Sequence, residues 1–225
     1  MLAGRRVKLA AVAAGAMTVL AGCGLHPGAA AVVEAETISH EEVDDVALAV
    51  CSANLASSEL TGQPAQSLPT RGAREVAMQI LLETELSQQF GEHEGVEANP
   101  QQVSQALAQN ENALAVIPQD RREDFKDALR GYAEGQLMLI EVGKESLGAE
   151  VSDDEAVTEG IRLRNEYVET LDVEVDPRYG RFEGGAFKRG GTSLSVAASD
   201  RAVAGERAQP GDAFVTGLPA SQLCS

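Results

Sequence analysis

The catalytic chemistry open to this chain is limited first by its histidines, of which the 225 residues hold three. They are His26, His40 and His93, so no histidine follows residue 93. A Ser-His-Asp or Cys-His enzyme needs an imidazole base beside its nucleophile. No Gly-x-Ser-x-Gly motif marks such a nucleophile. The residues therefore predict no catalytic site, and we expect that the protein is not an enzyme.

Two further patterns come close to a ligand site without completing one. His40-Glu41-Glu42 and Glu92-His93-Glu94 combine metal-binding residue types, but neighbouring residues on a helix do not face each other and no second cluster supplies the remaining ligands. Residues 185–192 nearly match a phosphate-binding loop, yet Gly191 stands where that motif needs lysine. We expect no metal, no nucleotide cofactor and a flexible loop at 185–192.

Composition narrows the partners and the fold class. The chain carries 18 basic and 35 acidic residues, for a net charge of −17. Such a charge opposes binding to nucleic acid and to anionic lipid headgroups. Tryptophan is absent and aromatic residues are 4% of the total. A core made of Ala, Leu and Val favours packed helices over a sheet sandwich, so we expect a mainly α fold.

The N-terminus has the layout of a secretory signal. Basic residues at 5–8 precede the uncharged segment 9–21, which is shorter than the roughly 20 apolar residues that a membrane-spanning helix needs. The segment closes on Leu20-Ala21-Gly22-Cys23. This tetrapeptide resembles the lipobox of bacterial lipoproteins, in which the cysteine thiol receives a diacylglycerol and the signal is cut just before it.

The lipobox resemblance implies a signal peptide at 1–22, a lipidated Cys23 and a small-residue tether at 23–30. The mature chain would then carry 15 basic and 35 acidic residues, and its lipid would anchor it to the outer face of the cell membrane. Two alternatives stay open: a cut elsewhere that leaves Cys23 an ordinary thiol, and export by the twin-arginine route through Arg5-Arg6.

The remaining cysteines, Cys51 and Cys224, form an even pair in an oxidising compartment. A disulfide between them would close a loop of about 174 residues, with a stabilisation of roughly 5 kcal/mol in the chain-entropy model. It would also fasten the C-terminus to the first helix. The alternative is two unpaired thiols.

Apolar spacing and capping residues predict the elements. Ser39 with Glu42, and Ser152 with Glu155, are capping boxes that open helices. The predicted helices cover 40–55, 73–90, 100–117, 120–147 and 153–171, and short strands are predicted near 29–33, 37–38, 171–175 and 194–197. We expect a helical domain at 31–171 and a β and irregular segment at 172–225, with the chain after 198 held mainly by Cys224.

The order of these features resembles a known family. Ala-Ala-Ala-Val-Val at 29–33, Ile38-Ser39 at a helix start and Ser-Asp-Asp-Glu at 152–155 are similar to the N-terminal domain of SurA-like and PrsA-like foldases. The whole chain more closely resembles SurA N-terminal-domain lipoproteins of high-GC Gram-positive bacteria. In those proteins Val-Asp-Pro-Arg-Tyr-Gly (175–180), Leu-Ser-Val (194–196) and Leu-Pro-Ala-Ser-Gln-Leu-Cys (218–224) recur.

This resemblance implies a helical chaperone domain that cradles unfolded exported polypeptides. It implies no prolyl isomerase activity, because residues 172–225 are too few for a parvulin domain and contain no histidine. We expect a holdase whose partners are newly exported polypeptides and whose only membrane contact is its lipid. The alternatives are a scaffolding envelope lipoprotein that binds one folded partner, and a degenerate isomerase with residual activity.

Overall fold

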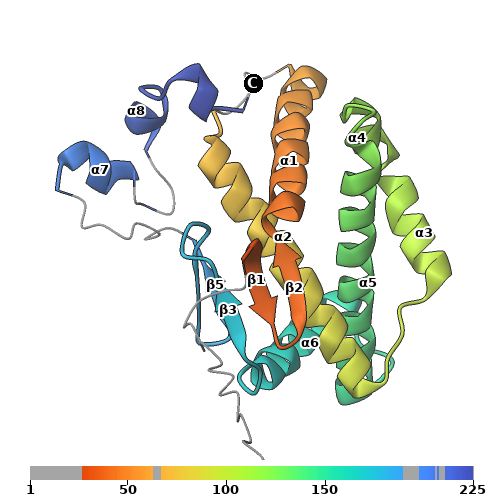
Figure 1. Cartoon of the computed structure of the whole chain (residues 1–225). Helices are drawn as coiled ribbons and strands as arrows, with labels where there is room; N and C mark the ends of the chain where they lie inside the picture. The colour runs from red at the N-terminus through yellow and green to blue at the C-terminus, as the bar shows by residue number, and fades with distance from the viewer. Residues whose placement is uncertain (1–26, 63–66, 190–197, 206, 208–210, 225) are drawn as a thin grey trace, which may run out of the picture.

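The computed structural model is mainly helical with a small β element, as the sequence predicts (Figure 1). It describes residues 27–62, 67–189, 198–205, 207 and 211–224. The helices are α1 (His40–Thr61), α2 (Thr70–Glu94), α3 (Pro100–Gln109), α4 (Glu111–Val116), α5 (Arg122–Leu147), α6 (Asp153–Val168), α7 (Asp200–Gly205), α8 (Asp212–Val215) and the 3₁₀ helix η1 (Ala220–Gln222). The strands are β1 (Ala29–Val33), β2 (Glu36–Ser39), β3 (Val173–Val175), β4 (Arg181–Glu183) and β5 (Ala186–Lys188).

Several sequence features lie outside the described residues. They are the signal-like segment 1–22, Cys23, His26 and the strand predicted at 194–197. Among the helices that are described, none has the length and apolar character needed to cross a bilayer.

Two helices begin at the predicted capping boxes. Ser39 Oγ accepts a hydrogen bond from the Glu42 backbone N–H at 3.1 Å, and the Glu42 carboxylate accepts one from the Ser39 N–H at 2.8 Å. Ser152 and Glu155 make the same pair of bonds at 3.3 and 3.2 Å. Each box satisfies backbone donors that the first helical turn leaves free. The predicted starts of α1 and α6 are therefore confirmed.

The helix predicted over residues 100–117 is divided, and that prediction is wrong. Asn110 ends α3, because its side-chain Nδ2 donates to the Ala106 carbonyl at 2.9 Å and its backbone N–H donates to the Leu107 carbonyl at 3.0 Å. Such local bonds from asparagine compete with the regular helical pattern. The helix is interrupted at Asn110, and the next helix, α4, begins at Glu111.

A three-stranded antiparallel sheet joins the beginning of the described chain to the segment after α6. Its order is β2-β1-β3, with Ala31 opposite Val175 and Val33 opposite Val173. At the β1–β2 turn Glu34 has a positive φ of 54°, and its carboxylate accepts a hydrogen bond from the Asp172 N–H at 2.7 Å. The predicted β connection between the N-terminal strand and the region after 171 is confirmed.

A second, two-stranded sheet replaces part of the loop expected at 185–192. Strands β4 and β5 pair Phe182 with Phe187 and Glu183 with Ala186. The two residues between them, Gly184 and Gly185, have φ of 60° and 72°. Two successive left-handed residues make the tight turn whose twist suits a hairpin. The flexible-loop prediction is thus wrong for residues 185–188; residues 190–192 lie beyond the described part.

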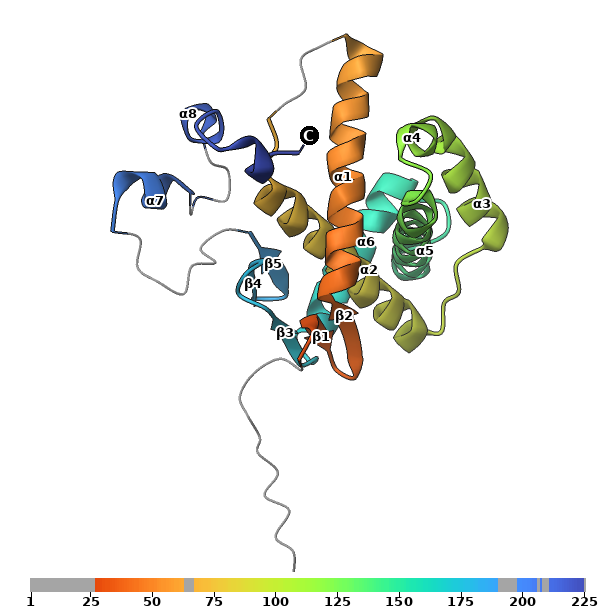
Figure 2. The ribbon, with the colours of Figure 1, turned by 45° about the horizontal axis from the view of Figure 1, so that its top comes forward.

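The main core lies between the three-stranded sheet, α1 and α2, and Figure 2 shows the sheet at the N-terminal end of α1. A smaller core around Phe90 and Leu139 joins α2, α5 and α6. Helices α3 and α4 lie on one side of this body, and α7 and α8 lie on the other (Figures 1 and 2). The largest fully buried side chains are Met78, Leu82, Ile117, Leu139, Val33, Val43 and Val168.

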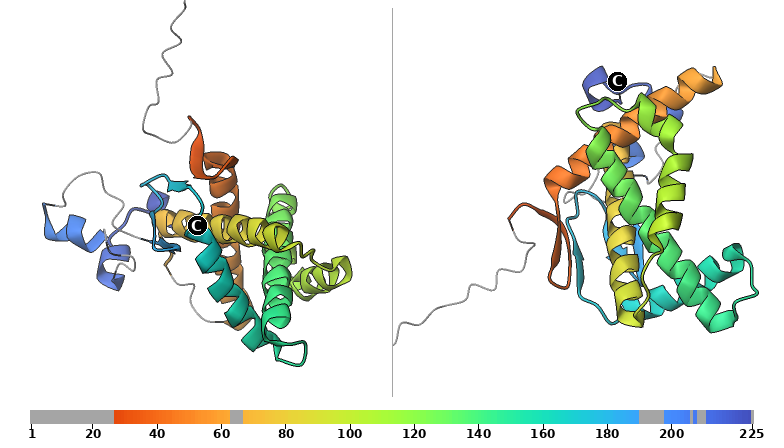
Figure 3. Two further views of the ribbon diagram at one scale, coloured as in Figure 1. Left: turned by 90° about the horizontal axis from the view of Figure 1, so that it is seen from below. Right: turned by 90° about the vertical axis from the view of Figure 1, so that its right-hand side faces the viewer.

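Helices α5 and α6 touch backbone to backbone. A Cβ atom on Gly160 would lie 2.1 Å from the Leu139 carbonyl oxygen, and one on Gly143 would lie 1.9 Å from the Ala156 carbonyl oxygen. No side chain fits at either position. The two glycines thus bring α6 against α5, and α6 also packs on α2 in the views of Figure 3.

The C-terminal segment is attached to the helical body at several points. Cys51 of α1 and Cys224 form a disulfide, with their Cα atoms 5.1 Å apart. The Cys224 N–H donates to the Leu68 carbonyl at 2.9 Å, and Leu223 forms an antiparallel bridge with Pro69. Within the region expected to be irregular, the described residues include the short helical elements α7, α8 and η1.

Replacement of Gly160 tests the close packing of α5 and α6. We expect Gly160→Ala to lower the free energy of unfolding by about 2 kcal/mol or more, because the new methyl group meets a backbone oxygen that has no room to move. Urea denaturation followed by circular dichroism measures this. Gly72→Ala is the matched control: its nearest neighbour would be 3.4 Å away, so a helix gain of about 0.5–1 kcal/mol is expected. Equal effects of the two changes contradict the packing argument.

Removal of the disulfide tests the attachment of the C-terminus. We expect Cys51→Ser with Cys224→Ser to lower the free energy of unfolding by about 2–4 kcal/mol, since the bond restricts a long loop in the unfolded chain. Hydrogen exchange should also become faster at the Cys224 amide, which bonds Leu68. Unchanged exchange there indicates that the backbone bridge holds the segment without the disulfide.

Candidate functional site

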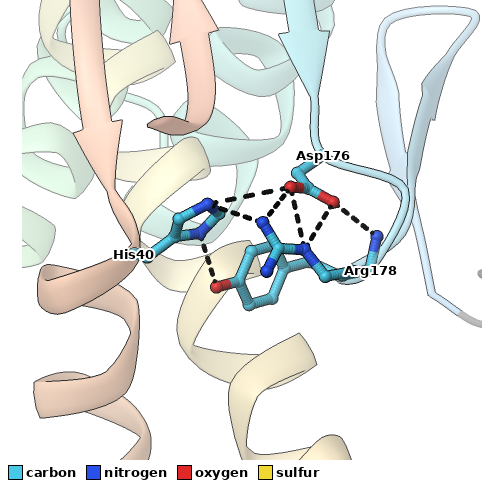
Figure 4. A network of polar contacts seen from close by, with 4 residues as sticks. His40, Asp176 and Arg178 are labelled. Carbon is cyan, nitrogen blue, oxygen red and sulfur yellow. Dashed lines mark hydrogen bonds and ion pairs between the residues drawn. The ribbon is translucent and has the colours of Figure 1, made fainter. Parts of the chain in front are cut away.

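A polar cluster fastens the turn after β3 to the start of α1 (Figure 4). His40 is the first residue of α1, while Asp176, Arg178 and Tyr179 follow β3. The sheet delivers this turn, because the Asp176 N–H donates to the Ala30 carbonyl at 2.8 Å just beyond the β1–β3 pairs. The Tyr179 N–H then donates to the Asp176 carbonyl at 3.0 Å and closes the turn.

His40 joins the cluster through both ring nitrogens. Its Nδ1 lies 2.8 Å from the Tyr179 hydroxyl, and its Nε2 lies 2.7 Å from Arg178 Nη2. A guanidinium can only donate hydrogen bonds, so His40 Nε2 accepts and the ring proton sits on Nδ1. In this arrangement His40 Nδ1 donates to the Tyr179 oxygen. Asp176 Oδ2 lies 3.8 Å from Nε2, beyond direct hydrogen bonding.

The Asp176 carboxylate is the anionic centre of the cluster. Arg178 donates to it from Nε at 3.1 and 3.0 Å, from Nη2 at 2.6 Å and from its backbone N–H at 2.8 Å. Burial alone would raise the pKa of Asp176, but the Arg178 hydrogen bonds outweigh it and the pKa is lowered. Burial raises the pKa of the Tyr179 hydroxyl, so it stays protonated. The ion pair between Asp176 and Arg178 stabilises the turn.

The cluster shows no catalytic arrangement. In the described part of the chain the His40 ring contacts Tyr179, Arg178 and Asp176, and none of these is a serine, threonine or cysteine that it could activate. The sequence indicated His40 only as a helix start and gave Asp176 to Tyr179 no role beyond the resemblance. The signal that could have linked them is that Asp176, Arg178 and Tyr179 follow a strand, β3, whose partner β1 is joined through β2 to His40.

The metal-like patterns stay separate in space. His40 lies in the cluster above, whereas His93 lies at the end of α2, with its Nε2 3.9 Å from Glu94. Among the described residues no group of three His, Cys, Asp or Glu side chains is placed to hold a metal ion. Of the predicted site residues, Cys51 and Cys224 are bonded to each other, and Cys23 lies outside the described chain.

A groove of about 440 Å³ lies between the last turns of α2 and α6. The partly exposed Leu163 and Tyr167 form its apolar wall together with the buried Phe90, and His93, Glu94, Glu166 and Thr170 complete the lining. The Tyr167 ring stacks on His93 with ring centroids 4.6 Å apart, and Phe90 lies tilted at 5.6 Å. We call this feature the α2–α6 groove. Its size falls within the usual range for ligand sites, and sequence periodicity gave no sign of it.

A smaller cavity of about 80 Å³ lies between α2, α6 and the β4–β5 hairpin. Arg164 on its wall is buried, and donates to Ser87 Oγ and Asn165 Oδ1, each at 3.1 Å. Burial lowers the pKa of Arg164, which the nearby Glu83 partly opposes. This arginine ties α6 to α2. The cavity is too small for a peptide side chain with its backbone, so the α2–α6 groove is the better candidate for binding.

Neutralisation of Asp176 tests the cluster. We expect Asp176→Asn to lower the free energy of unfolding at pH 7 by about 1–2 kcal/mol, the scale of hydrogen bonds to a charged group. The folded-state pKa of Asp176 is lowered, so its contribution is full above the unfolded value of about 3.9 and is lost as pH falls through the folded value. The difference from the unaltered protein should therefore shrink below about pH 4.

Urea denaturation at pH 7 and at pH 3 measures this effect. Glu174→Gln is the control, because Glu174 is an exposed carboxylate in β3, two residues before Asp176. A constant difference between pH 7 and pH 3 for Asp176→Asn contradicts the ionic role.

Comparison with known proteins does not assign the chain to a family. It matches no protein-family model, no curated protein and no solved structure. The likeness to SurA N-terminal domains therefore stays a prediction, and the function has to be argued from the groove and from the residues themselves.

Proposed function

We propose that the protein is a lipoprotein on the extracytoplasmic face of the cell membrane that holds unfolded exported polypeptides in the α2–α6 groove. The signal-like N-terminus and Cys23 support the location. The order of motifs similar to SurA N-terminal domains supports the activity. The single observation that carries the binding site is an open groove in which the partly exposed Leu163 and Tyr167 present apolar surface.

The proposed mechanism is physical and has no covalent step. An unfolded chain exposes apolar side chains, and each square ångström of apolar surface removed from water is worth about 25 cal/mol. The α2–α6 groove offers such surface without any rearrangement of the helices that form it. The 15 basic and 35 acidic residues of the mature chain, a net charge of −20, would keep the complex soluble and apart from other complexes.

The test is suppression of aggregation by the mature chain from residue 24, which contains every described residue. A chemically unfolded protein is diluted from denaturant into buffer, and light scattering is followed at stoichiometric ratios. An equally acidic inert protein controls for charge. We expect suppression well beyond this control, because the groove binds segments that otherwise associate with each other.

Paired substitutions on α6 assign any activity to the groove. We expect Leu163→Glu to abolish most of the suppression, because it places a charge on the apolar wall. Ile161→Glu is the matched control: it makes the same change two residues away, at an exposed apolar residue that does not line the groove. Melting curves establish that both variants are folded.

The outcomes distinguish a holdase from a scaffolding lipoprotein. Loss with Leu163→Glu alone supports client binding in the groove. No suppression by the unaltered chain rejects the holdase and favours a scaffolding lipoprotein with one folded partner, which a pull-down from envelope extracts would then identify.

A further inference from the structure

The α2–α6 groove joins an apolar wall to an acidic rim. Glu94 and Glu166 line it with exposed carboxylates, and no lysine or arginine appears among its described lining residues. His93 lies at the rim, with Nε2 3.9 Å from Glu94. The groove therefore presents aromatic and aliphatic carbon on its wall and negative charge at its edge.

Two helix ends add to this negative charge. Both α2 and α6 line the groove with residues of their C-terminal turns. The C-terminal end of a helix carries a partial negative charge from its carbonyl groups. The last turn of α6 holds no basic residue, and that of α2 holds only His93. Carboxylates and helix ends thus act in the same direction.

The ion pairs of the rim leave it with excess negative charge. Glu166 binds Arg162, but Arg162 also pairs with Glu159, so one guanidinium is shared between two carboxylates. The three residues together carry a net charge of −1. Among the described residues, Glu94 is paired with His93 alone, so the rim is able to accept another cation.

We propose that the α2–α6 groove holds a lysine or arginine side chain of the bound polypeptide, with its methylene stem on Tyr167 and Leu163 and its cationic head beside Glu94 and Glu166. Lysine and arginine are amphipathic, and they bury their stems on apolar surface while the charge stays at the edge. An aromatic wall also attracts the cation directly. The inference rests on the proposed function and specifies which client segments that function favours: apolar ones that carry basic residues.

The probe is a fluorescent nonapeptide with a central lysine between leucine and alanine residues, and its binding to the mature chain from residue 24 is measured by fluorescence anisotropy. Two further peptides replace the lysine with norleucine, which keeps the stem without the charge, or with glutamate. We expect the lysine peptide to bind about fivefold more tightly than the norleucine peptide at low salt, and the glutamate peptide to bind weakest. The lysine preference should diminish as salt rises.

Paired neutralisations localise the effect. We expect Glu94→Gln with Glu166→Gln to remove the lysine preference while the norleucine peptide still binds. The matched control is Glu92→Gln with Glu169→Gln, which changes the net charge equally at the same two helix ends but at exposed residues outside the groove lining. Retention of the preference in the control supports a local contact, and equal loss in both pairs overturns it.

The peptide series distinguishes the inference from the proposed function on which it rests. Equal binding of the lysine and norleucine peptides, lost in Leu163→Glu, overturns the basic-side-chain inference and leaves client binding in the groove intact. Binding of the norleucine peptide that Leu163→Glu does not affect, or no binding of any peptide, rejects the groove as the client site and both ideas with it.

Discussion

The backbone contact between α5 and α6 is the constraint on which most of this structure depends. A helix pair normally keeps its axes apart by the side chains between them. Here Gly143 and Gly160 remove those side chains, so each faces a carbonyl oxygen of the other helix. The resulting position of α6 sets its last turns beside those of α2, where the α2–α6 groove forms. It also brings Arg164 to Ser87 and directs the chain after α6 toward β1.

Contacts between distant parts of the chain then close the fold. The β1–β3 pairing, the His40 cluster and the Cys51–Cys224 disulfide each join segments more than 130 residues apart. Loop closure over such lengths costs entropy, and in these three places it is offset by backbone pairing, charge-assisted hydrogen bonds and a covalent bond. The core therefore includes the turn after β3 as well as the helices.

The predictions that the structure confirms rest on signals that are local in the sequence. Ser39 and Ser152 mark helix starts because capping is settled within four residues, and the apolar stripes of the long helices repeat at helical spacing. The sequence did not predict the break at Asn110, because asparagine also occurs inside helices. Whether the helix ends there depends on the hydrogen bonds that its side chain makes. The Gly184-Gly185 turn had a local signal, two glycines between alternating residues, which a phosphate-loop comparison obscured. The groove had no local signal and the His40 cluster had only an indirect one, because their members come from elements whose mutual placement depends on packing.

The central position of β1 has a mechanical consequence. If Cys23 carries a lipid as proposed, any load between the membrane and a held polypeptide enters the described fold near Ala29, at the start of a strand that is paired on both sides. An edge strand would peel away one hydrogen bond at a time. β1 leaves its place only when both ladders give way, and its buried side chains Ala30, Ala31 and Val33 leave the core at the same moment. Extraction of the strand nearest the proposed tether would therefore disrupt two ladders and part of the main core together.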